Sequence, residues 1–202
     1  MAEAKPGTRQ RSRGAGTRER IVDAAARLFY RHGIGSVSVD AVAEAAGVTK
    51  RTLYNHFRSK DDLVAAYLEA RDQPNLALFQ AWFDAADDDL ADRLRALFRK
   101  LAENAGGRSW KGCGYLRTAA ELVATPGHPA VQAARRHKRN VEAWLSSVIA
   151  AERPKAEAER LARQLQLLMD GAFAAGLLHR DPDYMQAAGE AADALLRRSE
   201  GR

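Results

Sequence analysis

The sequence predicts an all-α protein in which a small N-terminal helical unit is followed by a larger one. Alanine, the strongest helix former, supplies 41 of the 202 residues. Residues with β-branched side chains, which favour strands, are few outside the stretch 34–49. Apolar residues make up 46% of the chain, which is enough to fill a core. We therefore expect a folded helical protein rather than a disordered chain.

The first residues, 1–16, are predicted to form a disordered basic arm. They include several Gly and Arg residues and almost no large apolar side chain. The basic residues of this arm are Lys5, Arg9, Arg11 and Arg13. They suit contact with nucleic acid, or they belong to an inert solvated tail.

The first helix is predicted to begin after Thr17, which can serve as its N-cap, and to end at Gly33. Glycine suits that end because it adopts the left-handed backbone conformation without strain. One face of this helix is apolar at the spacing of a buried stripe, and it comprises Ile21, Ala25, Leu28 and Phe29.

Two shorter helices are predicted next. Ser38 is the expected N-cap of one helix, and Thr49 is the expected N-cap of the other, which spans 50–57. Gly47 lies in the tight turn between them. Two short helices joined by such a turn, the second led by basic and polar residues, are typical of a helix-turn-helix.

The rest of the chain is predicted to contain longer helices. Ser59 caps a helix that begins at residue 60 and has its apolar side at 63–68. A separate helix is expected after Pro74, and another begins near Cys113. The helix after Pro74 is expected over 75–86. The other helices are expected over 91–106, 129–151, 154–178 and 182–198.

The positive charge is confined to the first third of the chain. Residues 1–60 contain 12 Lys and Arg against 5 Asp and Glu, a net charge of +7. Residues 61–202 contain the other 20 basic residues and 21 acidic ones, a net charge of −1. This asymmetry indicates either a nucleic-acid-binding head on a near-neutral body or a solvated basic tail on an ordinary domain.

Several classes of protein are excluded. The single cysteine, Cys113, rules out a disulfide framework. The chain has no apolar run of about 18 residues and no signal-peptide pattern, so we expect a cytoplasmic protein with no membrane contact. It also has no GxSxG, Walker or HExxH motif and no Cys/His cluster. We therefore expect no catalytic residue, cofactor or metal.

Residues 17–68 resemble the DNA-binding region of TetR/AcrR-type repressors. The most specific motifs are the Ala-Gly-Val turn at 46–48, the Leu-Tyr-Asn-His-Phe run at 53–57 and the Ser-Lys-Asp-Asp-Leu run at 59–63. The resemblance implies a helix-turn-helix DNA-binding domain over 17–60. It also implies a larger helical domain over 61–202 that binds an effector and forms the dimer.

The DNA-reading residues are expected at the N-terminal end of the third helix, which enters the major groove. They are Thr49, Lys50, Arg51 and Thr52, followed one turn later by Tyr54 and Asn55. Leu53 and Phe57 are expected to face the core. The resemblance implies that phosphates are held by Tyr54, His56 and Lys60, with Ser36 or Ser38 at the second helix.

The effector pocket implied by the resemblance is expected among the middle helices and should suit a small, largely hydrophobic molecule. Each of its candidate walls is alternatively a core residue. The candidates are Phe79, Trp82, Phe83, Phe98, Trp110, Cys113, Tyr115, Trp144, Met169 and Phe173. Cys113 near a helix N-terminus is either a redox or electrophile sensor or a small buried hydrophobe.

The resemblance also implies a homodimer formed by the last two helices. Small residues at close-packing positions are the expected interface, namely Gly171, Ala174, Ala175, Ala188, Ala191 and Ala192. A dimer suits a palindromic operator because one short helix reads few base pairs. The predicted function is a ligand-controlled repressor. One alternative is an enzyme, but the sequence contains none of the catalytic motifs considered above. The other is an adaptor without DNA binding, which the basic residues Lys50, Arg51 and Lys60 disfavour.

Overall fold

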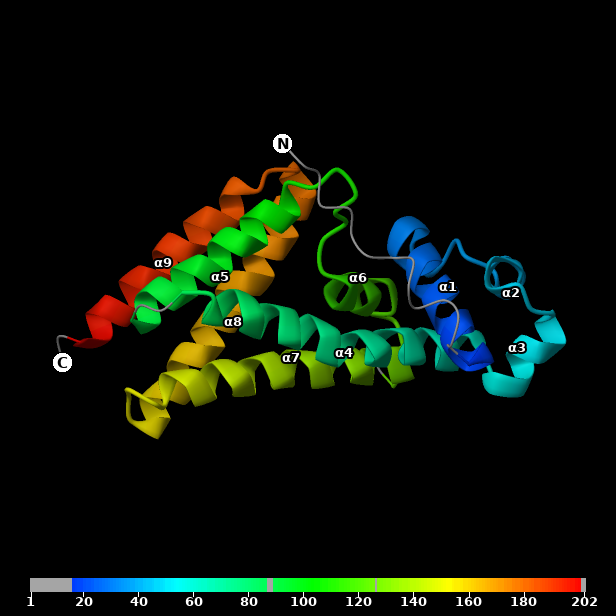
Figure 1. The fold of residues 1–202 in the computed structure, drawn as a ribbon, viewed down its shortest axis with the longest axis horizontal. Helices are drawn as coiled ribbons and strands as arrows, with labels where there is room; N and C mark the ends of the chain where they lie inside the picture. The colour runs from blue at the N-terminus through cyan, green and yellow to red at the C-terminus, as the bar shows by residue number, and fades with distance from the viewer. Residues whose placement is uncertain (1–15, 87–88, 126, 201–202) are drawn as a thin grey trace. The chain divides into compact units, whose positions relative to one another are not determined.

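The computed structural model describes residues 16–86, 89–125 and 127–200, and these form nine α-helices joined by turns and loops (Figure 1). The predicted all-α fold is therefore confirmed, while the predicted arm up to residue 15 lies outside the described residues. The helices are α1 Thr17–His32, α2 Val39–Ala46, α3 Lys50–His56, α4 Lys60–Asp84, α5 Leu90–Ala105, α6 Gly114–Glu121, α7 Pro129–Ile149, α8 Lys155–His179 and α9 Asp183–Glu200.

The chain divides into two compact units, Met1–Tyr67 and Leu68–Arg202. The first unit holds α1, α2, α3 and the start of α4, so it continues beyond residue 60, where the sequence places the end of the head. The second unit holds the rest of α4 and the five helices that follow. Helix α4 is thus the covalent connection between the two units.

The first unit is built on helix ends that the sequence largely predicts. Ser38 and Thr49 are N-caps as expected, and the backbone of Gly33 has a positive φ of 84° after α1. The start of α1 differs, because Gly16 rather than Thr17 is the N-cap. Glu19 explains this start, since its carboxylate accepts a hydrogen bond from the Gly16 N–H at 3.2 Å.

A small apolar core holds the first unit together. Ile21 and Phe29 of α1 are buried, as are Leu53 of α3 and Phe57 just after it. The ring of Phe29 packs at a tilt against that of Tyr67, with centroids 5.8 Å apart. The expected inward orientation of Leu53 and Phe57 is therefore confirmed.

Helix α4 differs from the prediction, because it runs unbroken for 25 residues where two separate helices were expected. Pro74 lies inside it and lacks the N–H that would donate to the carbonyl four residues earlier. Burial on both sides of the proline offsets this loss, since Leu68 precedes it and Leu76 and Phe83 follow it in buried positions.

The core of the second unit gathers side chains from α4, α5, α7, α8 and α9. Helices α5 and α9 lie side by side along their length (Figure 1). Their approach is close because Gly189 of α9 faces Phe98 of α5. Among the fully buried side chains are Leu97 and Leu101 of α5, Leu145 of α7 and Leu165 of α8.

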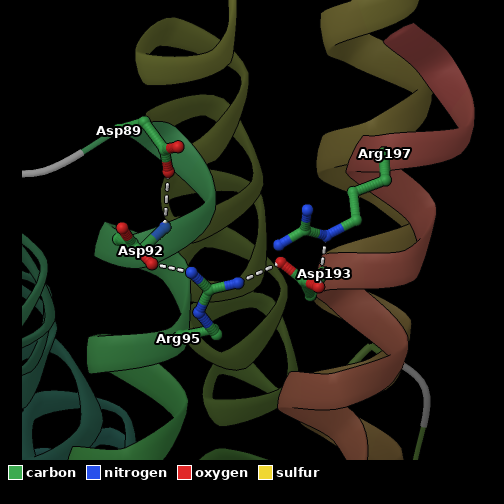
Figure 2. A network of polar contacts seen from close by, with 5 residues as sticks. All are labelled: Asp89, Asp92, Arg95, Asp193 and Arg197. Atoms are coloured by element: carbon green, nitrogen blue, oxygen red, sulfur yellow. Dashed lines mark hydrogen bonds and ion pairs between the residues drawn. The ribbon is translucent and has the colours of Figure 1, made fainter. Parts of the chain in front are cut away.

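Charged side chains join α5 to α9 beside this core (Figure 2). Arg95 of α5 pairs with Asp92 on its own helix and with Asp193 on α9. Asp193 also accepts a hydrogen bond from Nε of Arg197 at 2.7 Å, and this bond is the main reason why the pKa of Asp193 is lowered. Asp89 caps the start of α5 by accepting the N–H of Asp92 at 2.9 Å.

A polar cluster, in which His137 and Tyr115 are buried and Asp72 and Asn140 are partly buried, joins α4, α6 and α7. Nδ1 of His137 donates to Asp72 at 2.7 Å, and the amide of Asn140 donates to the other oxygen of Asp72 at 2.7 Å. The His137 ring stacks on Tyr115, with centroids 3.8 Å apart and planes 10° apart. The Tyr115 hydroxyl donates to the carbonyl of Leu68 at 3.0 Å. Leu68 and Asp72, which are one turn apart on α4, are thus bonded to α6 and α7 respectively.

Burial lowers the pKa of His137 below its ordinary value of 6.5, even though the hydrogen bond to Asp72 acts to raise it. The charge of Lys138 also lowers this pKa, while those of Asp72 and Asp170 raise it. His137 is therefore held neutral in the folded protein over a range in which a histidine in the unfolded chain takes up a proton.

Replacing Gly189 by alanine should destabilise the second unit. A Cβ there would lie 2.9 Å from Cβ of Phe98, an atom that moves only with its backbone. We expect a loss of about 1–3 kcal/mol in the free energy of unfolding, measured by urea denaturation. The matched control is Gly127→Ala, at an exposed loop position where a Cβ meets nothing within 4 Å and the backbone has no positive φ; it should change the free energy of unfolding by less than about 0.5 kcal/mol. Equal stability of the two variants would contradict the close packing.

The free energy of unfolding should decrease as the pH falls below about 6.5. The folded-state pKa of His137 lies below its unfolded value, so protonation favours the unfolded chain from pH 6.5 down to the lowered pKa and adds nothing further below it. Urea denaturation at several pH values should show a smaller decrease for His137→Gln than for the wild type. The exposed His32→Gln variant should retain the wild-type dependence; an equal dependence for all three proteins would contradict this role of His137.

Candidate functional site

The turn between α2 and α3 has a defined backbone geometry. Gly47 adopts the left-handed conformation, with φ 66° and ψ 39°. The N–H of Gly47 donates to the carbonyl of Glu44, and the N–H of Val48 donates to that of Ala43, both at 3.0 Å. This pair of bonds is a Schellman motif, which ends one helix and sets the direction in which the chain leaves it.

Helix α3 starts immediately after this turn and is oriented by its buried side. The hydroxyl of Thr49 accepts the N–H of Thr52 at 3.1 Å, which caps the helix. Leu53 is fully buried and Phe57 is 4% exposed. The opposite face of α3 consequently points to solvent. Its exposed side chains are those of Lys50, Arg51, Tyr54, Asn55 and His56.

Some predicted contact residues already have partners in the protein. Nζ of Lys50 forms an ion pair with Asp40 of α2 at 3.1 Å, between two exposed side chains. Nζ of Lys60 donates to the carbonyl of Ile34 at 2.6 Å and is partly buried. By contrast, Arg51 has no hydrogen-bond or ion-pair partner among the described residues, so its guanidinium is available to another molecule.

The predicted hydroxyl contacts lie at the ends of α1, α2 and α3. The hydroxyl of Ser38 accepts the N–H of Ala41 at 3.1 Å and keeps its own proton to donate elsewhere. The hydroxyl of Ser36 donates to the carbonyl of His32 at 2.6 Å, which closes the turn after α1. The hydroxyls of Thr49 and Thr52 lie 2.8 Å apart and bond to each other.

A separate groove of about 470 Å³ lies between α6 and α7 in the second unit. Tyr115 and Leu116 line it from α6, and Val123 lines it from the loop that follows. Three basic residues of α7 complete it, namely Arg135, Lys138 and Arg139. The sequence analysis predicts no pocket here, although one face of α7 carries apolar and basic residues at helical spacing, which is a signal for such a groove.

The predicted effector-pocket residues mostly lie elsewhere. Phe83, Phe98, Met169 and Phe173 are buried in the core of the second unit. Phe79, Trp82, Trp110, Cys113 and Trp144 are partly buried against that core. Of the ten predicted residues, only Tyr115 lines the groove between α6 and α7. Cys113 is the N-cap residue of α6, with no hydrogen bond from its side chain to the helix.

The predicted dimer residues fall into two groups. Gly171 and Ala174 are exposed on α8, and Ala175 and Ala191 are partly exposed. Ala188 and Ala192 instead pack within the core of their own unit. The exposed side of α8 also carries two large apolar residues that the sequence prediction omits, Leu167 at 68% exposure and Leu178 at 78%.

Within the described ranges, no group of three or more His, Cys, Asp and Glu residues is arranged to hold a metal ion. In the same ranges, none of the helices combines the length and apolar character required to cross a membrane.

Comparison with known proteins identifies the first unit. Residues 21–67 match the family described as bacterial regulatory proteins, tetR family. The chain is 36% identical over 85 residues to the HTH-type transcriptional regulator TtgR of Pseudomonas putida, an alignment that covers 42% of this chain and 39% of TtgR. It is 45% identical over 53 residues to AcrR of Shigella flexneri, which covers 26% and 25% of the two chains. These matches thus span well under half of each curated relative.

Two solved structures extend the similarity to nearly the whole chain. A TetR-family transcriptional regulator from Streptomyces coelicolor is 32% identical, with a TM-score of 0.74 over 90% of this chain and 95% of its own. A TetR-type regulator from Streptomyces avermitilis is 34% identical, with a TM-score of 0.72 over 89% of this chain and 99% of its own. The reduced form of NemR from E. coli shares the fold at 20% identity, with a TM-score of 0.76. The chain therefore belongs to the TetR/AcrR family of helix-turn-helix transcriptional regulators, which bind DNA and are not enzymes.

Proposed function

We propose that this regulator is a repressor that binds a palindromic operator as a homodimer and is released by a small, largely hydrophobic effector. The observation that carries the DNA-reading part of this proposal is Arg51. It lies in the first turn of α3, is exposed and has no partner among the described residues. An unpaired arginine at this end of a recognition helix suits bidentate donation to a guanine.

The other exposed residues of α3 supply the rest of the reading surface. Asn55 lies one turn beyond Arg51 on the same helix and suits adenine, which an amide pairs with in a bidentate manner. Lys50 can reach a base once its ion pair with Asp40 breaks. This ion pair is exposed to solvent and therefore holds the lysine only weakly. Thr49 and Thr52 complete the set at the helix N-terminus.

Phosphate contacts are proposed around this reading surface. Tyr54 and His56 are exposed on α3, and the Ser38 hydroxyl keeps a free proton at the start of α2. Ser36 donates to His32 in the DNA-free protein and exchanges that bond for a phosphate oxygen when DNA binds. Lys60 acts differently, since its bond to the Ile34 carbonyl makes it a support for the turn that precedes α2.

The dimer is proposed to form through the exposed side of α8, together with α9. Leu167, Gly171, Ala174 and Leu178 recur at three- and four-residue intervals along α8, which places them in one stripe. Large leucines at its ends and small residues at its centre allow two helices to approach closely. Burying such exposed leucines against a second copy removes apolar surface from water.

Release by an effector is proposed to act through α4, the helix that both units share. An effector that prefers one packing of the second unit shifts the balance between two conformations of the dimer. Effector and operator then weaken each other's binding by the same factor, because the coupling is reciprocal.

Replacing Arg51 by alanine should weaken binding to operator DNA by about 10- to 100-fold per recognition helix, because one bidentate base contact contributes about 1–3 kcal/mol. The operator fragment is obtained by selecting random duplexes with the wild-type protein, and affinities are measured by fluorescence anisotropy. Binding to unrelated DNA should change much less.

The matched control is Arg99→Ala, which removes an exposed arginine from α5. It should retain wild-type affinity for the operator. An Arg51→Ala protein that binds the operator as tightly as the wild type would show that Arg51 does not contact the operator bases as proposed.

Replacing Leu167 and Leu178 together by glutamate should convert the dimer to a monomer at micromolar concentration, because four charges would then be buried in the interface. Sedimentation velocity measures this change, and helical content by circular dichroism should stay the same. Leu78→Glu, at an exposed leucine of α4, is the control and should remain dimeric. A double variant that stays dimeric would place the interface elsewhere.

A further inference from the structure

The groove between α6 and α7 has an uneven distribution of charge. Its ten lining residues include three basic ones and no acidic one, and the remaining seven are apolar or aromatic. Its volume of about 470 Å³ lies within the range of roughly 300–1,000 Å³ that is typical of small-molecule sites. The groove thus combines an apolar wall with a purely cationic edge.

The described chain neutralises only part of this cationic edge. The ammonium group of Lys138 donates to Asp170 of α8, which offsets its charge. Arg135 and Arg139 are exposed, and neither has a hydrogen-bond or ion-pair partner among the described residues. They are four residues apart on α7, a spacing at which like charges on a helix repel each other.

We propose that this groove is the effector site and that its ligand is a small amphipathic anion, a carboxylate with an apolar chain or ring. Arg135 and Arg139 would hold the carboxylate, because the guanidinium fork matches its two oxygens. The apolar part would cover Leu116, Val131 and Val123, of which Val123 is 78% exposed in this structure. The assignment as effector site rests on the proposed function, whereas the anion-binding groove does not.

Charge selects this ligand class over its neutral and cationic relatives. A neutral amphiphile of equal size would fill the apolar wall but leave Arg135 and Arg139 facing each other unpaired. A cationic amphiphile would be repelled by Arg135 and Arg139. The groove should therefore discriminate among ligands with the same apolar part by the charge of their head group.

The groove wall also has a direct connection to α4. Tyr115 lines the groove and stacks on His137, which bonds to Asp72 of α4. The Tyr115 hydroxyl donates to the Leu68 carbonyl on the same helix. A ligand that displaces this ring must break or lengthen a bond to α4, so Tyr115 is a positioning residue between groove and helix.

Calorimetric titration of the DNA-free protein tests the site. The probes are decanoate, 2-naphthoate, decanol and decyltrimethylammonium, each below its aggregation concentration. At least one of the two carboxylates should bind, and the Arg135→Gln/Arg139→Gln variant should bind it at least tenfold more weakly. Decanol should bind more weakly than decanoate and equally to both proteins. Decyltrimethylammonium should not bind.

Two further variants test the location. Ala119→Phe places a ring in the groove and should weaken binding of the carboxylate by at least tenfold, whereas Arg99→Gln, on α5, should leave it unchanged. The proposal is overturned if neither carboxylate binds, if both arginines can be removed without effect, or if decanol binds as tightly as decanoate. A change in oligomeric state in the groove variants would also overturn it, because a second copy of the chain would then cover the groove.

The role as effector site is tested separately with operator DNA. The bound carboxylate should lower operator affinity at least tenfold. At a carboxylate concentration that saturates each protein, Tyr115→Phe should reduce that effect, since the ring remains while its hydroxyl bond to Leu68 is lost. A carboxylate that binds through the two arginines without changing operator affinity would overturn the effector assignment and leave the anion site standing. Neither outcome bears on the proposed binding of the operator by α3.

Discussion

The left-handed backbone at Gly47 is the constraint on which the arrangement of the first unit depends. Helix α3 has only seven residues, too few for a helix to persist in water through its own hydrogen bonds. Its position comes from the Schellman bonds of the turn before it, from the Thr49 cap and from the burial of Leu53 and Phe57. Because both ends of α3 are held in this way, its outer face can consist entirely of polar residues that contribute little to folding.

The second unit instead consists of long helices joined by a few partly buried polar contacts. Asp72 is the clearest example, since it accepts hydrogen bonds from both His137 and Asn140 of α7. Polar groups that lose contact with water on folding are costly unless they are paired, so a cluster of this kind favours one arrangement of α4 against α7 over near alternatives. Tyr115 belongs to the same cluster and also borders the groove. Core packing, polar pairing and the wall of the groove therefore meet at one aromatic ring.

Local signals in the sequence predict the first unit well, and tertiary ones limit the prediction of the second. Ser38 and Thr49 act through bonds three residues away, so their roles are visible in the sequence alone. The helix break expected before residue 75 is absent, because packing that only the folded chain shows outweighs the effect of Pro74 on α4. The same limit applies to Ala188 and Ala192: helical spacing marks them as close-packing positions but does not say whether they face another helix of their own chain or a second subunit. The groove was missed because its walls come from two helices and an intervening loop.

The ion pair of Lys50 with Asp40 has a consequence for the ionic-strength dependence of DNA binding. Each phosphate that a protein neutralises releases condensed counterions, which contributes roughly 0.9 to the slope of log affinity against log salt concentration. Lys60 donates to a neutral carbonyl and so keeps its full charge, with two further N–H donors for a phosphate. A lysine shared with a carboxylate, as Lys50 is with Asp40, instead releases fewer counterions than its formal charge suggests. The number of basic residues near α3 is therefore an upper limit on the number of counterions displaced. The effective charge of this surface, as given by the salt dependence of DNA binding, is smaller than its formal charge.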